Sequence, residues 1–395
     1  MKIIAVIEKP ITSGGGFNQA LNAVQQMNNI SVDKFDFSVV TTAKENISYL
    51  VRLNIKANFV SITLVDKILS KLFSGRIWGK ILASLRIICP FEKQLIKQNC
   101  DLVYLVEQSS RAESLQNINF ITTVHDLCHQ DQLEFPEVSN FGEFRARELV
   151  FQNTLKRAFL VMVDSEELAN KICTRYGVDR NRIVPMPFSP SPFLQESQAN
   201  NSTDILKLYN LDYGYFFYPA QFWAHKNHFR IIEAVNLLHQ EDILCRVVFV
   251  GGNQGNYDFI NDLICDYGLG KYIKTLGFIP AEHMHVLYKN CQAVVMPTYF
   301  GSTNLPPLEA WLLGKPLIYS DLCSEQAGNA AILINPDDAF SIADAMKSML
   351  EDHISNKYIK NGYERLKQIS STRKRAAELL EYKLLKFEKM RQCWK

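Results

Sequence analysis

The sequence predicts an α/β protein made of two doubly wound domains in tandem. Two observations lead to this prediction. Short apolar runs alternate with longer segments of helical periodicity along nearly the whole chain, which is typical of parallel sheets covered by helices. The 395 residues, 47% of them apolar and 21% charged, are also enough to bury two ordinary cores.

The first domain is expected to span residues 1–195. Its predicted strands are the apolar runs 3–8, 102–105, 120–124 and 160–163. The stretch 143–158 has the period of an amphipathic helix. The N-terminal apolar run is too short for the core of a secretion signal, and Glu8 and Lys9 follow it at once. We therefore expect this run to be the first buried strand.

A change of composition marks the junction between the domains. Residues 189–210 are crowded with proline, serine and asparagine and sustain no apolar period, so we expect a linker at 196–212. The second domain should then span 213–371. Its predicted strands are 215–218, 246–250, 273–276, 293–296 and 316–319, and its predicted helices are 229–239, 257–267, 284–289, 306–313 and 339–350.

The two domains are expected to hold ligands at the carboxyl ends of their strands, facing each other across a cleft. Residues 372–395 are helical by period and carry eight Lys or Arg against three Glu. This segment is either a solvated closing helix or a helix packed back on the first domain.

Charge and cysteine usage exclude several classes of protein. A formal net charge of only +2 argues against a nucleic-acid-binding protein. The nine cysteines are scattered and never form a C-x-x-C pair, which is typical of a reducing compartment. No run of eighteen apolar residues occurs, so no spanning helix is expected and the predicted location is the cytoplasm.

The most informative segment is 296–311, MPTYFGSTNLPPLEAW, which follows a predicted strand and opens a predicted helix. Pro306 and Pro307 suit a first helical turn, and the small polar residues before them should leave backbone N–H groups available. Such a helix start attracts anions, so a diphosphate would fit there. Glu309 is expected in the first turn, either as an acceptor for ribose hydroxyls or as an acid favoured by the helix dipole.

A second motif, YPAQFWAHKN at 218–227, directly follows the first strand of the second domain. Lys226 stands near the start of a helix, where a cation is slightly disfavoured by the dipole. A lysine that binds a diphosphate is therefore preferred over a merely solvated one. A hydrogen bond from a charged group contributes on the order of 1.5–3 kcal/mol.

The first domain offers two further candidates. A glycine-rich turn at 12–16 contains Gly15 and Gly16, which either let backbone approach a ligand or form a plain tight turn. His125 follows a predicted strand and precedes Asp126. It is either a structural histidine or a group that binds or polarises a substrate.

With these motifs the chain resembles the retaining GT-B glycosyltransferases of the group 1 type, which include enzymes of bacterial polysaccharide and O-antigen synthesis. Residues 306–310, PPLEA, match the second half of that family's Glu, seven residues, Glu pattern. Gly301 stands where the family has the first Glu, which contacts the donor sugar, and Gln221 stands where it has an Arg.

The resemblance implies a GT-B fold and transfer of a sugar from a nucleoside diphosphate sugar, with retention, to a saccharide or lipid-linked acceptor. The implied catalytic residues are His125, Lys226 and Glu309. Donor binding is implied for Gly15, Gly16, Gln221, Lys226, Gly277, Phe278, Thr303, Asn304, Leu305 and Glu309.

No metal or other cofactor is expected. The sequence contains no Asp-x-Asp, which argues against the glycosyltransferase architecture that holds a divalent metal under the diphosphate. It also lacks a phosphate loop, an H-E-x-x-H and a G-x-S-x-G motif.

Residues 67–89, KILSKLFSGRIWGKILASLRIIC, contain five Lys or Arg and no acid. Their amphipathic pattern with a tryptophan predicts either peripheral contact with an anionic membrane or helices packed on the first domain. Two other functions remain open from the sequence alone. One is a sugar-nucleotide epimerase of the same fold, and the other is a non-catalytic sugar- or nucleotide-binding protein.

Overall fold

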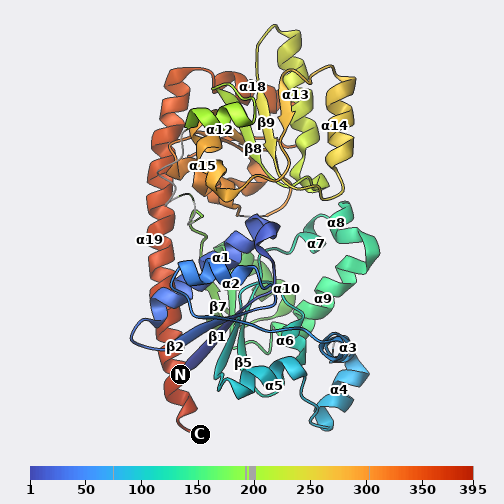
Figure 1. Cartoon of the computed structure of the whole chain (residues 1–395), viewed down its shortest axis with the longest axis vertical. Helices are drawn as coiled ribbons and strands as arrows, with labels where there is room; N and C mark the ends of the chain where they lie inside the picture. The colour runs from blue at the N-terminus through green and yellow to red at the C-terminus, as the bar shows by residue number, and fades with distance from the viewer. Residues whose placement is uncertain (74, 192–193, 195–201, 302, 395) are drawn as a thin grey trace. The chain divides into compact units, whose positions relative to one another are not determined.

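The computed structural model describes residues 1–73, 75–191, 194, 202–301 and 303–394. The chain forms two compact units (Figure 1). The first unit contains residues 1–131, 140–188 and 372–395, and the second contains residues 132–139 and 189–371. The α/β character of both units is as predicted. The boundaries differ, because the junction falls after Phe188 and because 132–139 belongs to the second unit.

The first unit is built on a seven-stranded parallel sheet of order β3-β2-β1-β4-β5-β6-β7. Its strands are β1 (Lys2–Ile7), β2 (Asp36–Thr41), β3 (Ala57–Phe59), β4 (Leu102–Leu105), β5 (Asn119–Thr123), β6 (Leu160–Val163) and β7 (Ile183–Pro185). Its helices are α1 (Gly15–Ser31), α2 (Asn46–Arg52), α3 (Leu64–Phe73), α4 (Arg76–Ser84), α5 (Pro90–Lys97), α6 (Arg111–Ser114), α7 (Cys128–Asp131), α9 (Glu143–Thr154) and α10 (Glu166–Tyr176).

The second unit contains a six-stranded parallel sheet of order β10-β9-β8-β11-β12-β13. Its strands are β8 (Tyr215–Pro219), β9 (Val247–Val250), β10 (Ile273–Thr275), β11 (Cys291–Met296), β12 (Leu317–Ser320) and β13 (Ile332–Ile334). Its helices are α8 (Pro136–Ser139), α12 (Ser202–Leu208), α13 (His228–Gln240), α14 (Tyr257–Asp266), α15 (Ala281–Asn290), α16 (Leu305–Leu312), α17 (Ser324–Ala327), α18 (Ala339–Ser348) and the start of α19 (Asp352–Arg391).

The central strands were predicted and several outer ones were not. Every residue of β4, β6 and β9 is buried, as expected for strands covered on both faces. Strands β2, β3, β7 and β13 were not predicted from the sequence. Three of these have only three residues, which is too few to establish a period, and β3 is partly exposed along its length. Part of the predicted linker, residues 202–208, is the helix α12 of the second unit.

The C-terminal segment packs on the first unit. Helix α19 is continuous from Asp352, twenty residues before the predicted start at 372. Its buried residues Leu380, Leu384 and Phe387 lie against this unit, and the ring of Phe387 is 4.5 Å from that of Phe159. The amino group of Met1 forms a salt bridge to a carboxylate near the end of α19, at 2.5 Å from Glu388. In the part of the chain that the structure describes, no helix is long and apolar enough to cross a bilayer.

Candidate functional site

The strand order places a candidate site at one edge of the second sheet. The order reverses between β8 and β11, because the chain crosses from β8 to β9 on one side and to β11 on the other. In open parallel sheets, ligands bind outside the carboxyl ends of the strands at such a reversal. The segments that leave β8 and β11 carry Lys226, Thr298 and Asn304.

Lys226 ends a 3₁₀ turn (Ala224–Lys226) that follows β8, and its backbone is held from two sides. Tyr218 of β8 donates its hydroxyl hydrogen to the carbonyl oxygen of Lys226 at 2.7 Å. The next residue, Asn227, adopts a left-handed conformation (φ 60°) that asparagine tolerates better than most residues. Its side-chain amide donates to the carbonyl oxygens of Pro297 and Pro336, at 3.1 and 2.8 Å.

The ammonium group of Lys226 points at the segment after β11. Its Nζ lies 3.4 Å from Thr298 Oγ1 and 3.4 Å from Asn304 Oδ1. Both oxygens are neutral, and 3.4 Å is long for a hydrogen bond from a charged donor. The structure thus brings together Lys226 and Asn304, two of the residues predicted to bind the donor, and adds Thr298, which no motif marked.

The start of α16 differs from the expectation of freely available amides around 303–305. The backbone N–H of Asn304 donates to Gln326 Oε1 at 2.8 Å, and Gln326 Nε2 donates back to the Asn304 carbonyl oxygen at 2.7 Å. Pro306 and Pro307 have no N–H to offer. Two of the first three residues of α16 therefore carry no N–H, so an anion at this helix start depends more on Lys226 than the sequence indicated.

Glu309 lies deeper than predicted. Helix α16 begins at Leu305, so Glu309 is its fifth residue and lies beyond the first turn, where the sequence analysis had placed it. Its carboxylate is buried and accepts a hydrogen bond from the Tyr288 hydroxyl at 2.5 Å. Burial raises the pKa of Glu309 to about 7, although hydrogen bonds from Tyr288 and from the Ser191 backbone act to lower it.

Gly301 has a structural reason to be glycine. Its φ is 89°, in the region that side chains disfavour, and a Cβ atom there would lie 3.3 Å from both Asn304 Nδ2 and the Thr303 carbonyl oxygen. The family's glutamate at this position would therefore be strained in this backbone.

Replacing Gly301 by alanine is expected to destabilise the protein by about 1–2 kcal/mol through the left-handed backbone alone. Denaturant unfolding measures this change. The control is Gly252→Ala, because Gly252 lies in the same unit, has no positive φ and leaves open space for a Cβ. Equal stability of the two variants would contradict the backbone argument.

Three further predicted donor residues follow strands β8 and β10 of the second unit. Gln221 follows β8 and is partly exposed. Gly277 follows β10 with a φ of 67°, and its carbonyl oxygen accepts a hydrogen bond from Gly251 at 2.9 Å. Phe278 is 56% exposed, so its ring is available to a flat ligand. Their role toward a nucleobase stays a prediction.

Segment 132–139 brings an unpredicted carboxylate beside the Lys226 turn. Glu137 Oε1 accepts hydrogen bonds from the backbone N–H of His225 at 3.1 Å and from its ring at 3.0 Å. The His225 ring stacks on Phe300 with centroids 4.1 Å apart. Burial acts to raise the pKa of Glu137, but the hydrogen bonds from His225 outweigh it and the pKa is lowered. No motif marked Glu137, because its partner is 88 residues away.

Glu137→Ala is expected to lower the free energy of unfolding by about 1–3 kcal/mol, since it leaves two His225 donors without their acceptor. The control is Glu134→Ala, which changes an exposed glutamate of the same segment and should change stability by no more than about 0.5 kcal/mol. Chemical denaturation of both variants decides this. If Glu137→Ala left the free energy of unfolding unchanged, the contact with His225 would not be what holds segment 132–139 in place.

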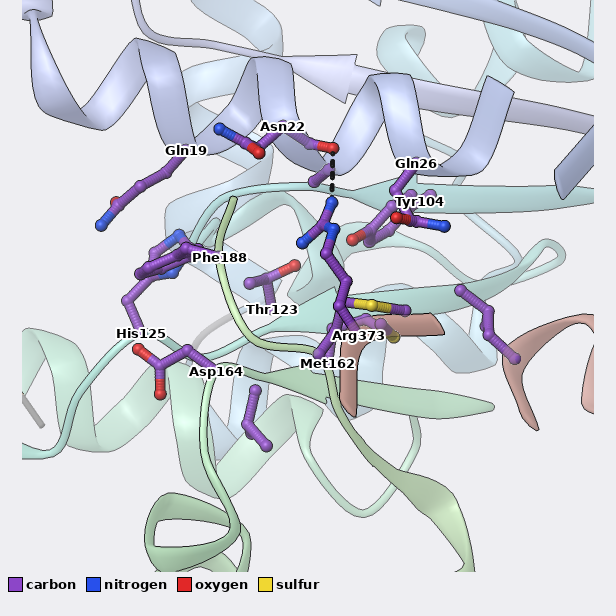
Figure 2. A pocket seen from close by; sticks show the side chains of 14 residues that line it. Gln19, Asn22, Gln26, Tyr104, Thr123, His125, Met162, Asp164, Phe188 and Arg373 are labelled. Atoms are coloured by element: carbon purple, nitrogen blue, oxygen red, sulfur yellow. Dashed lines mark hydrogen bonds between the residues drawn. The ribbon is translucent and has the colours of Figure 1, made fainter. Parts of the chain in front are cut away.

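His125 lies in the first unit, directly beyond β5, and lines a small cavity there. The cavity measures about 30 Å³, far below the roughly 300–1,000 Å³ of typical ligand pockets. Polar groups around it come from Gln19, Asn22, Gln26, Tyr104, His125, Asp164 and Arg373. Figure 2 shows His125 and Asp164 on one side of this cavity and Arg373 on the other.

The histidine of this cavity is neutral at physiological pH. Desolvation of the His125 ring, helped by the positive charge of Lys9, lowers its pKa to about 4 against the opposing effect of Asp126. The ring centroid lies 6.0 Å from that of Phe188. A neutral imidazole can donate and accept hydrogen bonds to sugar hydroxyls but contributes no positive charge.

Arg373 is a charged cavity residue that no motif marked, and it comes from α19. Its guanidinium donates to the carbonyl oxygen of Pro187. It also donates, at 3.3 Å, to the carbonyl oxygen of Asn22, as Figure 2 shows. Desolvation lowers the pKa of Arg373 to about 10, so it remains charged at neutral pH. The sequence did show that residues 372–395 are basic, but this composition does not indicate which Lys or Arg side chain lines the cavity.

Gly15 and Gly16 begin α1, and Gly14 before them has a positive φ of 60°. A Cβ at Gly16 would meet Lys9 Nζ at 2.9 Å, whereas one at Gly15 would meet nothing within 4 Å. Nearby, Glu107 accepts hydrogen bonds from the backbone N–H groups of Glu8 and Lys9 at 3.1–3.3 Å. These contacts fix the segment that precedes the glycines.

Sequence comparison identifies the second unit. Residues 207–365 match the family model described as Glycosyl transferases group 1. The chain carries a group 1 glycosyltransferase domain. This glycosyltransferase is 26% identical to O-antigen chain mannosyltransferase B of Escherichia coli, over 67% of this chain and 70% of the relative. It is 25% identical to O-antigen chain mannosyltransferase RfbU of Salmonella typhimurium, over 64% and 68%.

Solved structures extend the likeness to the whole glycosyltransferase and confirm the predicted GT-B fold. Anabaena HepE in complex with UDP-glucose superposes with a TM-score of 0.70 at 16% identity, covering 97% of this chain and 100% of that one. WaaG, a glycosyltransferase involved in lipopolysaccharide biosynthesis, gives 0.66 at 12% identity, covering 96% and 99%.

Proposed function

We propose that this glycosyltransferase moves a sugar from a nucleoside diphosphate sugar to a saccharide or lipid-linked saccharide, with retention and without a metal. The observation that carries the proposal is the ammonium group of Lys226 beside Thr298 and Asn304, where the order of the second sheet reverses. The O-antigen mannosyltransferases that resemble the chain support a saccharide acceptor. The bound UDP-glucose of HepE supports a nucleotide-sugar donor.

In the proposed reaction Lys226 meets the charge that develops on the diphosphate as the bond from sugar to phosphate breaks. The acceptor oxygen bonds to the sugar carbon on the same face, and its proton passes to the departing phosphate oxygen. No protein nucleophile takes part in this front-face route. Leu305 contributes a backbone amide near the helix start, Glu309 accepts the ribose hydroxyls, and neutral His125 hydrogen-bonds a substrate hydroxyl.

A donor screen tests the proposal. Thermal shifts with uridine, guanosine, adenosine and thymidine diphosphate sugars, including GDP-mannose, should select one base. The selected donor and lipid-linked oligosaccharides should then give a product whose anomeric proton coupling matches that of the donor. Activity should survive EDTA. Consumption of the donor without an acceptor would favour an epimerase, and binding without turnover would favour a non-catalytic protein.

We further propose that the protein works at the cytoplasmic face of a membrane, contacting anionic lipid through residues 67–89. What supports this is the exposure of Ile68, Ile77 and Trp78 beside the basic residues of the segment. Fractionation of cells at low and high salt tests it, since an electrostatic peripheral protein is released from membranes by salt.

A further inference from the structure

Helices α3 and α4 form a surface that is apolar on its outer side as well as its inner side. Inward, Phe73, Leu82 and Cys89 make a small core of their own, with Leu69, Leu72 and Ile87 packed against it. Outward, seven large apolar side chains are exposed: Leu64, Val65, Ile68, Ile77, Trp78, Ile81 and Leu85. We call these seven the outer apolar face. Figure 1 shows α3 and α4 at the periphery of the first unit.

The surface is firmly attached to the sheet domain beneath it. Asp66 is buried, and its carboxylate accepts hydrogen bonds from the Phe91 backbone N–H at 2.7 Å and from Thr63 at 2.7 and 3.0 Å. Attachment through Asp66 and through the small core holds α3 in one orientation. The exposed apolar side chains are therefore a fixed feature of the fold.

A basic cavity opens beside this face. It has a volume of about 290 Å³ and is lined by Lys67, Ser70 and Lys71 of α3 and by Ser110 and Arg111 at the start of α6. Among the residues that the structure describes, no carboxylate forms a salt bridge with Lys67 or Lys71, although they are one helical turn apart and repel each other. Arg111 pairs through Nε with Glu8 at 2.7 Å.

The placement of charge relative to apolar side chains decides between possible occupants. On α3 the row Leu64–Ile68 lies next to the row Lys67–Lys71, so the apolar row and the cationic row run side by side along one helix. An interfacial helix has this arrangement, with apolar side chains among acyl chains and cations at the headgroups. A second copy of this chain would bring the same cations against each other.

We propose that the cavity of Lys67, Ser70, Lys71, Ser110 and Arg111 binds the phosphate headgroup of an anionic phospholipid while the outer apolar face enters the same leaflet. The inference rests on the membrane contact proposed above and names its binding site. The hydroxyls of Ser70 and Ser110 suit phosphate oxygens, and Lys67 and Lys71 supply the net charge, because the charge of Arg111 is offset by Glu8. Trp78 suits the depth of the headgroups, where its ring is apolar and its N–H stays wet.

Vesicle sedimentation tests the site. The protein should sediment with vesicles of phosphatidylglycerol and phosphatidylcholine at 50 mM salt, and neither with pure phosphatidylcholine nor at 500 mM salt. Lys67→Gln/Lys71→Gln should lower the partition coefficient about tenfold or more. The control is Lys93→Gln/Lys97→Gln, an exposed pair on α5 with the same spacing, which should bind as the wild type does.

Two further measurements separate the alternatives. Trp78→Ser should weaken sedimentation without removing its salt dependence, because it removes apolar contact and leaves the cations. The thermal shift with the nucleotide sugar should be unchanged in every variant, which separates this proposal from the function of the second unit. Three outcomes would each overturn the proposal. The first is an equal loss of vesicle binding in both double-lysine variants, and the second is binding of inorganic phosphate without binding of vesicles. The third is a dimer that forms through α3 independently of salt.

Discussion

Lys226→Ala is expected to lower kcat/KM for sugar transfer by roughly 10- to 100-fold. The substitution removes one charged donor worth about 1.5–3 kcal/mol, and each 1.36 kcal/mol corresponds to about a tenfold change in rate. The effect should be this large because Gln221, at the place of the family's arginine, carries no charge. Measured initial rates with a saturating acceptor and varied donor give the value.

How the loss of kcat/KM divides between kcat and KM indicates when Lys226 acts. A lysine whose bond strengthens as the diphosphate departs should affect kcat as well as KM. Lys226→Arg keeps the charge and should retain more activity than alanine does. Lys289→Ala, on an exposed position of α15, serves as the control and should behave as wild type. Wild-type activity of Lys226→Ala would refute the proposed role of the ammonium group and with it the assigned site.

Donor affinity is expected to rise roughly tenfold between pH 6 and pH 8 in the wild type and to stay flat in Glu309→Gln. Since the pKa of Glu309 is raised to about 7 by burial, only about a tenth of it is ionised at pH 6 and about nine tenths at pH 8. An ionised carboxylate accepts hydroxyl hydrogens more strongly than a protonated one. Calorimetric titration of the donor at several pH values measures the change.

The same carboxyl group predicts the pH dependence of stability. Its pKa is about 7 in the folded chain and near 4.5 when unfolded, so the folded state binds more protons between these values. The free energy of unfolding should therefore fall as pH rises from about 4.5 to 7, and Glu309→Gln should lack this part of the decline.

Tyr288→Phe is a second test of the role of Glu309 in donor binding. The Tyr288 hydrogen bond lowers the pKa of the carboxyl group, so its removal should move the midpoint of the donor-affinity profile to higher pH. An unchanged midpoint, or a wild-type profile in Glu309→Gln, would mean that another group controls donor binding.

The sequence described the second unit better than the first. Its buried strands are continuous apolar runs, and the motifs at 218–227 and 296–311 lie at strand ends, where the fold places ligands. The short strands β3 and β7 of the first unit carry no such signal, because three residues do not establish a period, and β3 is also partly exposed.

The detailed geometry of the candidate site depended on which hydrogen-bond partner each polar group has in the folded chain. The sequence placed Asn304 at a helix start, but Gln326, 22 residues further on, takes up its amide. The sequence placed Glu309 in a first turn, but the helix begins one residue earlier than predicted and burial raises the pKa of the carboxyl group. Glu137 and Arg373 carried no motif at all.

The sequence by itself determined the α/β class, the two sheets, the position of Lys226 after β8 and the basic amphipathic character of 67–89, because these follow from local periodicity and from the order of residues. Only the tertiary structure decided that Glu137 supports His225, that Arg373 enters the cavity of His125, and that Leu82 turns inward while Ile77 and Trp78 stay exposed. The physical reason is that burial and hydrogen bonding depend on neighbours distant in the chain, and these neighbours are defined only once the sheets have formed.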